Sequence, residues 1–181
     1  MLHRRVHRGF TLIELLVVVA IIGIIAAIII PMFLDALQKS KQKRTMAEVR
    51  LVGTCWMAWL TDQVAAGAAG TSVRTYELTG LDEIEPEQLL SSLYVSQNFF
   101  YCTEVPVRDS WGHDYEYYVN PETLLGIRVM AIRSTGRDGV FSDTTYEIGP
   151  YVATDYDEDI LWADGLFVHY PAGRAMASNA L

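Results

Sequence analysis

The feature that most constrains this chain is a single carboxylate, Glu14, at the start of a segment that is otherwise apolar from Leu15 to Ile30. An ionised carboxylate in hydrocarbon costs at least a few kcal/mol, so a chain that keeps one there usually has a partner for it. The nearest cation is an α-amino group, which exists beside Glu14 only if the chain is cut after Gly9. The alternative is an ordinary membrane anchor whose carboxylate reaches the interface.

The apolar segment has the length of one membrane span. At about 1.5 Å per helical residue, Leu12 to Ile30 reaches roughly 28 Å, close to the thickness of a bilayer core. Arginines but no acidic residues precede it, which predicts a cytoplasmic N-terminus and an extracytoplasmic C-terminus. A secretory signal peptide would carry its cleavage site after the apolar stretch. We therefore expect a single-pass anchor that survives processing.

The residues Gly9-Phe10-Thr11-Leu12-Ile13-Glu14 resemble the processing site of type IV pilins and of the pseudopilins of type II secretion. In that family a membrane peptidase cleaves after the glycine and N-methylates the new first residue, here Phe10. The family's glutamate, whose proposed role is to pair with the N-terminal amine of a neighbouring subunit, corresponds to Glu14. The resemblance implies a leader over residues 1–9 that is removed, and assembly roles for Phe10 and Glu14.

The apolar pattern becomes amphipathic beyond Pro31, another residue that we expect to matter for assembly. Its ring removes a backbone donor, which predicts a kink or a loosened turn. We expect a transmembrane helix over residues 10–30 that continues as an amphipathic helix over 31–61 and accepts a sheet on one face. The apolar stripe consists of Met46, Val49, Val52, Gly53, Cys55, Trp56, Trp59 and Leu60.

Residues 62–181 are expected to form the extracytoplasmic globular domain. The pattern predicts a short helix from Pro86 to Leu90, followed by strands at Tyr115 to Val119, Ile127 to Ile132 and Leu166 to Tyr170. The fold class is therefore α+β, with a long N-terminal helix packed on a small antiparallel sheet. Together with the processing site, this arrangement is pilin-like.

Three segments of the globular part resemble motifs of major pseudopilins, in the same order. Asp109-Ser110-Trp111-Gly112-His113-Asp114-Tyr115-Glu116-Tyr117 resembles Asp-Pro-Trp-Gly-x-x-Tyr-x-Tyr, with Ser110 in place of proline. Ser134-Thr135-Gly136-Arg137-Asp138-Gly139 resembles Ser-x-Gly-x-Asp-Gly, and Asp157-Glu158-Asp159-Ile160-Leu161-Trp162 resembles an acidic cluster before a tryptophan. The order of these motifs favours secretion over the other pilin-like systems.

Residues 135–164 are predicted to form an acidic, irregular loop, and the resemblance implies that this loop binds one calcium ion. Calcium takes six to eight oxygen ligands from carboxylates and carbonyls. The candidate ligands are Asp138 with the carbonyls of Thr135 and Val140, and then Ser142, Asp143, Asp155, Asp157 and Asp159. The loop is not an EF-hand, because Ile160 stands where that motif needs glycine. The alternative is a solvated acidic loop that aids solubility.

Cys55 and Cys102 are the only cysteines. An oxidising exterior permits a disulfide between them, which would stabilise the fold by roughly 4 kcal/mol. The alternative is that Cys55, which lies in an apolar helical pattern, is a buried thiol. The sequence leaves both possibilities open.

The charge distribution argues against nucleic acid as the main partner. The formal net charge is −8, and residues 138–164 contain eight acids and no Lys or Arg. A basic cluster beyond the anchor either faces lipid headgroups, faces acidic surfaces of neighbouring subunits, or is solvated: Lys39, Lys41, Lys43, Arg44 and Arg50. No nucleophile-elbow, zincin or phosphate-loop pattern surrounds Ser134, His113 or His169, so we expect no enzyme.

The resemblance implies a structural subunit of a type II secretion pseudopilus. Such a subunit waits as a single-pass protein of the inner membrane, with its C-terminus in the periplasm, and then assembles into a periplasmic homopolymeric filament. The implied partners are other copies of the chain, minor pseudopilins, the prepilin peptidase and methyltransferase, the inner-membrane assembly platform and membrane lipid. One alternative is a type IV pilus major pilin for adhesion, motility or DNA uptake. Another is a monomeric membrane-anchored binding protein.

Overall fold

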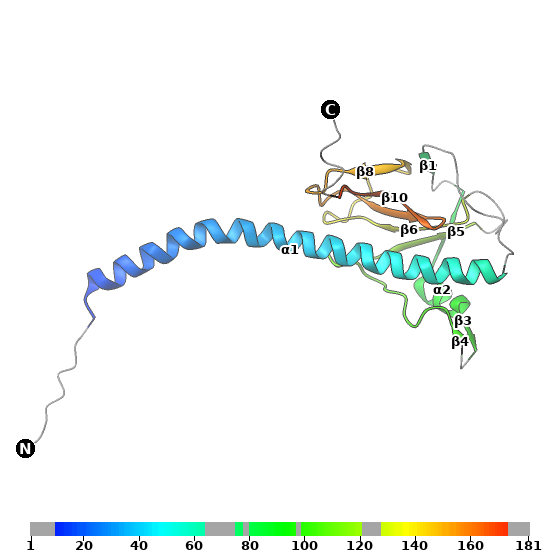
Figure 1. Cartoon of the computed structure of the whole chain (residues 1–181), viewed down its shortest axis with the longest axis horizontal. Coiled ribbons are helices and arrows are strands. Elements are labelled where there is room, and N and C mark those ends of the chain that lie inside the picture. The colour runs from blue at the N-terminus through cyan, green and yellow to red at the C-terminus, as the bar shows by residue number, and fades with distance from the viewer. Residues whose placement is uncertain (1–9, 64–74, 78–79, 97–98, 121–127, 174–181) are drawn as a thin grey trace, which may run out of the picture. The chain divides into compact units, whose positions relative to one another are not determined.

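The computed structural model describes residues 10–63, 75–77, 80–96, 99–120 and 128–173 (Figure 1). The leader, including Gly9, lies outside these residues. The chain divides into two compact units, Met1–Lys39 and Ser40–Leu181. Helix α1 (Leu12–Gln63) begins in the first unit and ends in the second.

Helix α1 confirms the long continuous helix predicted over residues 10–61. It contains 52 residues and continues through Pro31. The proline ring has no N–H to donate to the carbonyl four residues earlier, so this turn of the helix has one backbone hydrogen bond fewer. The first unit contains no other helix or strand among the residues that the structure describes.

The second unit contains a six-stranded sheet, ordered β2-β5-β6-β9-β10-β8. These strands are β2 (Asp82–Ile84), β5 (Glu116–Val119), β6 (Met130–Ser134), β9 (Ile160–Ala163), β10 (Leu166–Pro171) and β8 (Gly149–Tyr151). Neighbouring strands are antiparallel, except that β8 is parallel to β10. The predicted α+β fold with an antiparallel sheet is thus confirmed, with one parallel edge strand added.

Two short ladders accompany the main sheet. Strand β1 (Thr75–Glu77) pairs with β7 (Thr145–Glu147), and β3 (Tyr94–Ser96) pairs with β4 (Phe99–Phe100). Helix α2 (Pro86–Leu93) precedes β3 and contains the predicted helix at Pro86 to Leu90. The C-terminal part of α1 lies between the six-stranded sheet on one side and α2, β3 and β4 on the other (Figure 1).

The structure differs from the sequence prediction in the acidic segment 135–164, which was expected to be an irregular loop. It contains β7, β8 and β9, and β9 lies inside the main sheet between β6 and β10. All four residues of β9 are buried, so the strand has no polar alternation, and three acids directly precede it. The signal for it was Asp164-Gly165, whose positive φ angles of 47° and 96° suit a tight hairpin turn into β10.

The core forms where the amphipathic part of α1 meets the sheet. Val49, Val52, Trp56 and Leu60 of α1 are buried, in a cluster with Ile132 and Trp162 among others. Met46, by contrast, is only partly buried. Gly53 permits the close approach, because a Cβ atom built there would lie 2.6 Å from the ring of Trp162.

Replacing Gly53 with alanine is expected to destabilise the second unit by about 1–3 kcal/mol, because the new methyl group overlaps the Trp162 ring. Thermal unfolding of the purified full chain in detergent measures this. Gly23→Ala on the same helix is the control, since nothing lies within 4 Å of the Cβ position there. A Gly53→Ala variant as stable as the unmodified chain would contradict the close packing, because alanine otherwise favours a helix.

Candidate functional site

The N-terminal turn of α1 supplies Glu14 with partners from its own chain. Oε2 of Glu14 accepts hydrogen bonds from the backbone N–H and the hydroxyl of Thr11, both at 2.9 Å. The N–H of Glu14 in turn donates to Oγ1 of Thr11 at 3.2 Å. This reciprocal arrangement is a capping box, which satisfies helix N–H groups that have no intrahelical acceptor. The sequence signal, Thr-x-x-Glu before an apolar run, was missed in the sequence analysis. Phe10 precedes the cap and is 76% exposed.

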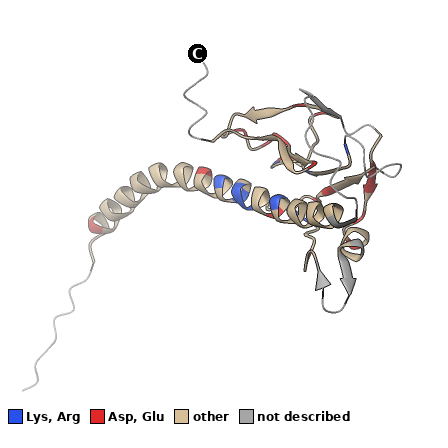
Figure 2. Cartoon of the chain, turned by 45° about the vertical axis from the view of Figure 1, so that its right-hand side comes forward, with Lys and Arg blue, Asp and Glu red and all other residues tan. Residues whose placement is uncertain are grey.

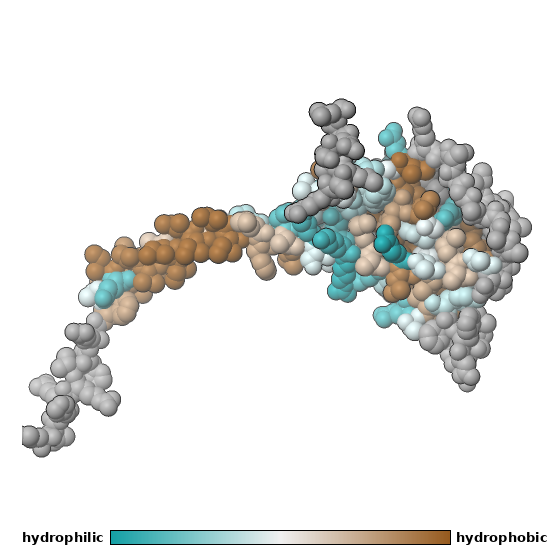
Figure 3. Space-filling view, in the orientation of Figure 1, coloured by the Kyte–Doolittle hydropathy of each residue, from teal (hydrophilic) through white to brown (hydrophobic). Residues whose placement is uncertain are grey.

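Every residue from Leu15 to Ile30 of α1 is apolar and most of the large ones are exposed, and the face of this part seen in Figure 3 is correspondingly hydrophobic. Among the described residues, α1 is the one helix long and apolar enough to cross a membrane, and its most apolar stretch is not buried in the protein. In water such a surface would be unstable, so this segment fits a membrane anchor. Within α1, Lys and Arg residues occur only beyond this part, along the middle of the helix (Figure 2).

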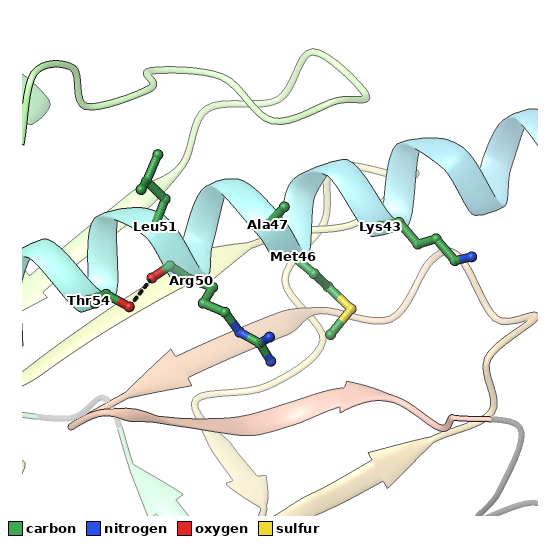
Figure 4. Close-up of a pocket in the computed structure, with 6 residues that line it drawn as sticks. All are labelled: Lys43, Met46, Ala47, Arg50, Leu51 and Thr54. Atoms are coloured by element: carbon green, nitrogen blue, oxygen red, sulfur yellow. Dashed lines mark hydrogen bonds between the residues drawn. The ribbon is translucent and has the colours of Figure 1, made fainter.

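A groove of about 440 Å³ runs along the exposed side of α1 in the second unit (Figure 4). Its lining combines apolar and basic side chains: Lys43, Met46, Ala47, Arg50, Leu51 and Thr54. Leu51 is 61% exposed, and the guanidinium of Arg50 lies 5.3 Å from the centre of the Phe167 ring on β10. The groove is thus a mixed apolar and basic surface beside the sheet.

Asp109 organises the Trp-Gly motif. Its buried carboxylate accepts hydrogen bonds through Oδ1 from the backbone N–H groups of Trp111, Gly112 and His113, at 2.9, 2.9 and 3.0 Å. Oδ2 accepts the hydroxyl proton of Ser134 from the end of β6, at 2.7 Å. One side chain therefore folds the turn and attaches it to the main sheet.

Ser110, which stands where the resembled motif has proline, has a contact that proline cannot make. Its backbone N–H donates to Oγ1 of Thr45 on α1 at 3.3 Å. Thr45 is fully buried. Nearby, the Tyr115 hydroxyl donates to Glu48 of α1 at 2.9 Å, and burial raises the pKa of Tyr115 well above its ordinary value. The Trp-Gly motif is thereby bonded to the helix as well as to the sheet.

The three C-terminal motifs meet in space. His113 of the Trp-Gly motif approaches the motif from Ser134 to Gly139. Its Nε2 lies 3.1 Å from the carbonyl oxygen of Arg137 in that motif. The Arg137 N–H donates to the carbonyl of Tyr156, next to the acidic cluster, at 2.7 Å. At Gly136, which has a φ of 68°, a Cβ atom would lie within 3.0 Å of three backbone oxygens of residues 156–158. This glycine therefore lets the second and third motifs touch.

Asp159 is the most buried carboxylate of the acidic segment. It is fully buried, and its Oδ2 accepts hydrogen bonds from the Ser142 N–H at 3.1 Å and from the Tyr146 hydroxyl. Its Oδ1 is buried and has no hydrogen-bond partner among the described residues. Burial, the largest cause, raises the pKa of Asp159, and the charge of Asp138 raises it further.

Buried Arg133 of β6 holds this segment on the sheet, a role that sequence reasoning did not find. Its guanidinium donates to Glu116 at 2.6 Å, to the Tyr146 hydroxyl at 3.1 Å and to the Asp143 carbonyl at 3.2 Å. The residues next to Arg133 in the sequence do not indicate these partners, because the partners come from other strands and from the loop before β7.

The candidate calcium ligands have different environments. Asp138 is exposed and its Oδ1 accepts the Val140 N–H, while Asp143 accepts the N–H groups of the two residues after it. Asp157 forms two hydrogen bonds with Arg137, at 2.8 and 2.5 Å, which lower its pKa. The described residues contain no group of three or more His, Cys, Asp or Glu that could hold a metal.

Among the candidate ligands, Asp159 and Asp157 differ in what their oxygens contact. The Oδ1 of Asp159 is a buried acceptor without a hydrogen-bond partner among the described residues, and a hard cation would satisfy it. Asp157 already has a cationic partner in Arg137. Most of the remaining oxygen ligands would have to be backbone carbonyls, such as those of Thr135 and Val140, or water.

The histidines and Ser134 have structural contacts. Ser134 donates to Asp109, and Nδ1 of His169 lies 3.0 Å from the Asp159 carbonyl oxygen. Burial lowers the pKa of His169, which favours the neutral ring. In the part of the chain that the structure describes, Ser134, His169 and Asp138 do not form a hydrogen-bonded triad.

Comparison with known proteins agrees with this arrangement. The prokaryotic N-terminal methylation motif matches residues 4–30. The type II secretion system core protein G of Pseudomonas aeruginosa is 25% identical over 148 residues, which cover 82% of this chain and 97% of that protein. The core protein G of Vibrio cholerae is also 25% identical, over 84% of this chain and 97% of that protein.

A fimbrial protein matches over a shorter length. The type IV major fimbrial protein FimA of Dichelobacter nodosus is 37% identical over 81 residues, which cover 37% of this chain and 52% of that protein. The chain thus spans about half the length of this relative. No solved structure matches the chain.

The methylation motif, the apolar helix and the antiparallel-rich sheet that follows it in the chain support a type IV pilin-like protein. Within this class, the chain is close to the major pseudopilin of type II secretion systems, because the similarity to core protein G extends over almost the whole of that protein. The proteins it resembles are structural subunits.

Replacing Asp109 with alanine is expected to destabilise the second unit by about 3 kcal/mol or more, because three backbone N–H groups and the Ser134 hydroxyl lose their acceptor. Asp109→Asn, which keeps one acceptor oxygen for the turn, should lose clearly less. Thermal unfolding of the full chain in detergent measures both. Equal losses for the two variants would show that the charge, and not the acceptor geometry, stabilises the turn.

Proposed function

We propose that this chain is the major structural subunit of a type II secretion pseudopilus, which assembles into a helical filament and drives export of folded proteins across the outer membrane. The observation that carries the proposal is the extent of the similarity to core protein G, over 97% of that protein. The meeting of the three pseudopilin-like motifs around Asp109 and Gly136 supports it. In this proposal the chain is a substrate of a prepilin peptidase and methyltransferase and not itself an enzyme.

The proposed path begins in the inner membrane, with the globular part in the periplasm. The peptidase cleaves between Gly9 and Phe10, and the Phe10 amine is methylated. Subunits are then extracted through an inner-membrane assembly platform, with minor pseudopilins as further partners. The apolar part of α1 exchanges lipid contacts for contacts with other copies. This head-to-tail contact is heterologous, so it extends into a fibre and does not close into a ring.

The capping box refines the proposed role of Glu14. Its Oε2 is occupied by Thr11 of its own chain, which holds the carboxylate near the position of the future N-terminal amine. In the filament we propose that the carboxylate also pairs with the Phe10 amine of a neighbouring subunit. A polar pair inside an apolar bundle is well suited to set the register between subunits.

The groove on α1 is the proposed contact surface of the globular part with a neighbour. Its exposed apolar side chains favour burial, and its Lys43 and Arg50 suit an acidic surface. The acidic segment of another copy has this charge, since residues 138–164 contain eight acids and no Lys or Arg. Contact with anionic lipid headgroups is the other use for the same cations before assembly.

Glu14→Ala is expected to be processed and inserted but to assemble poorly, because the charge and the two hydrogen bonds that the carboxylate accepts from Thr11 are lost. Glu14→Gln separates the two roles, since glutamine at this position still accepts from Thr11 but cannot pair with an amine as an ion. If the charge pair sets the register, the glutamine variant should also fail, while Thr11→Val should still assemble. Filament yield after shearing, with immunoblots for processing, measures this.

Normal filaments from Glu14→Gln would remove the charge-pairing role and leave only the helix cap. Normal filaments from Glu14→Ala would rule out both the charge-pairing role and the capping role of this side chain. Accumulation of the unprocessed form would mean that the substitution acts on the peptidase step instead.

We further propose that the acidic segment binds one calcium ion through Asp159 and Asp138, with backbone carbonyls completing the ligands. Bound calcium would satisfy the buried oxygen of Asp159 and offset the repulsion among the acids. The proposed effect is to hold the segment between β6 and β9 in one conformation. The role is structural.

Calcium added to the EDTA-treated full chain is expected to raise its thermal midpoint by about 5–10 °C at saturating concentration, and magnesium should not reproduce this. Asp159→Asn should abolish the calcium-dependent shift. Asp157→Asn is the matched control and should keep the shift, because Asp157 is engaged by Arg137. The absence of a shift in the unmodified chain would contradict the site, and loss of the shift only in Asp157→Asn would place it elsewhere.

A surface type IV pilin is the second candidate function, favoured by the 37% identity to a fimbrial protein over a shorter segment. Deletion of the gene, with secreted enzymes and surface fibres assayed in the same strain, separates the two. Lost secretion with intact fibres is expected. Lost fibres with intact secretion would make the chain a pilin, and no change in either would contradict a major role in both systems.

A further inference from the structure

The two cysteines come from distant parts of the second unit and meet in one core cluster. Cys55 lies on α1, half-buried, and Cys102 lies after β4 and is 5% exposed. Cys102 belongs to the cluster that contains Trp56 and Leu93, and Cys55 packs against this cluster. Both residues are thiols in the structure.

The two thiols are neighbours at this cluster. Cys102 is one of the groups that raise the pKa of Cys55, and the Cys102 thiol donates to the carbonyl oxygen of Glu104 at 2.9 Å. Two cysteine side chains that reach one core cluster from separate backbone segments are candidates for a disulfide. The surrounding cluster is apolar, so the bridge would be enclosed and protected from reductants.

We propose that Cys55 and Cys102 form a disulfide that fastens the segment containing α2, β3 and β4 to helix α1. This inference rests on the proposed periplasmic orientation, because that compartment is oxidising. Each thiol loses its proton, and the pair loses two electrons to the disulfide of a thiol oxidoreductase, which leaves as a dithiol. One sulfur–sulfur bond forms in the chain and one breaks in the oxidant.

The bridge would strengthen a part of the fold that the main sheet does not hold. Among the described residues, strands β3 and β4 pair with each other, and the main sheet contains neither. The same segment leads into the Asp109 turn, which is bonded to Thr45 on α1 through Ser110. A covalent link at Cys55 would therefore hold α1 against this segment from a second point.

The environment of Cys55 indicates when the bridge forms. Burial, the largest cause, and the contact with Cys102 raise the pKa of Cys55 to about 11. The thiol is then almost wholly protonated at neutral pH, and the thiolate is the form that attacks a disulfide. Oxidation is thus expected during folding, before the core closes, and reduced folded protein should oxidise slowly.

The test is thiol trapping of the full-length chain. Cells that produce it are quenched in acid, the chain is denatured without reductant, and a maleimide reagent is added. The proposal predicts no labelling and a monomer two hydrogens lighter than the reduced chain. Two labelled thiols, or a disulfide-linked dimer, would overturn it.

A second experiment distinguishes two reasons for a missing disulfide: that the two cysteines cannot reach each other, or that the globular part is not in the oxidising periplasm. Purified, reduced and unfolded chain is refolded in detergent with oxidised and reduced glutathione. If the disulfide forms in this refolding experiment but the thiols are free in cells, the proposal is overturned. The conclusion is then that the chain does not fold in an oxidising compartment. Free thiols in both arms would overturn it on geometry alone.

The stabilising effect has its own control. Reduction of the bridged chain is expected to lower the thermal midpoint by about 10 °C, from the length of chain that the bridge closes. The double variant Cys55→Ala with Cys102→Ala loses core contacts in both conditions, so its midpoint should not respond to the reductant. An equal response of both proteins would overturn the stabilising role.

Discussion

The carboxylate of Asp109 accepts hydrogen bonds from three backbone N–H groups of the Trp-Gly turn and from the Ser134 hydroxyl at the end of β6. The same turn contacts α1 through Ser110 and the Ser134–Gly139 motif through His113. A buried carboxylate is stable only when donors surround it, so this one group requires the turn, the strand and the motif to be in place together. The close meeting of the pseudopilin-like motifs follows from that requirement.

The acidic segment shows how the environment separates carboxylates that look alike in the sequence. Asp157 is partly exposed and paired with Arg137, which lowers its pKa, while Asp159 two residues later is fully buried and has a raised pKa. Strand β9 begins directly after Asp159, so the chain enters the core at this point. The buried, incompletely bonded carboxylate is therefore the group to which the calcium proposal attaches, and the alternating pattern of acids around it is secondary.

Helix α1 serves two environments with one continuous backbone. Its first part is apolar on every side and fits lipid, and later the apolar core of a filament. Its second part has one face buried against the sheet and another that carries the groove with Lys43 and Arg50. The change occurs without a break in the helix, because backbone hydrogen bonding is local and does not depend on what the side chains touch. In the proposed function, this lets one element act as anchor, as core helix and as contact surface.

The sequence by itself determined the features that depend on local pattern and composition: the N-terminal methylation motif, the apolar segment that follows it, the long helix, α2, and strands β5 and β10. Strand β9 was missed because a fully buried strand has no polar alternation, although Asp164-Gly165 marked its hairpin. Only the tertiary structure decided which acid is buried, that Arg133 joins Glu116 to Tyr146, and that Cys55 and Cys102 reach one core cluster. These residues are far apart in the chain, so no periodicity or spacing encodes their meeting, which needs the strands to pair and the helix to pack on the sheet.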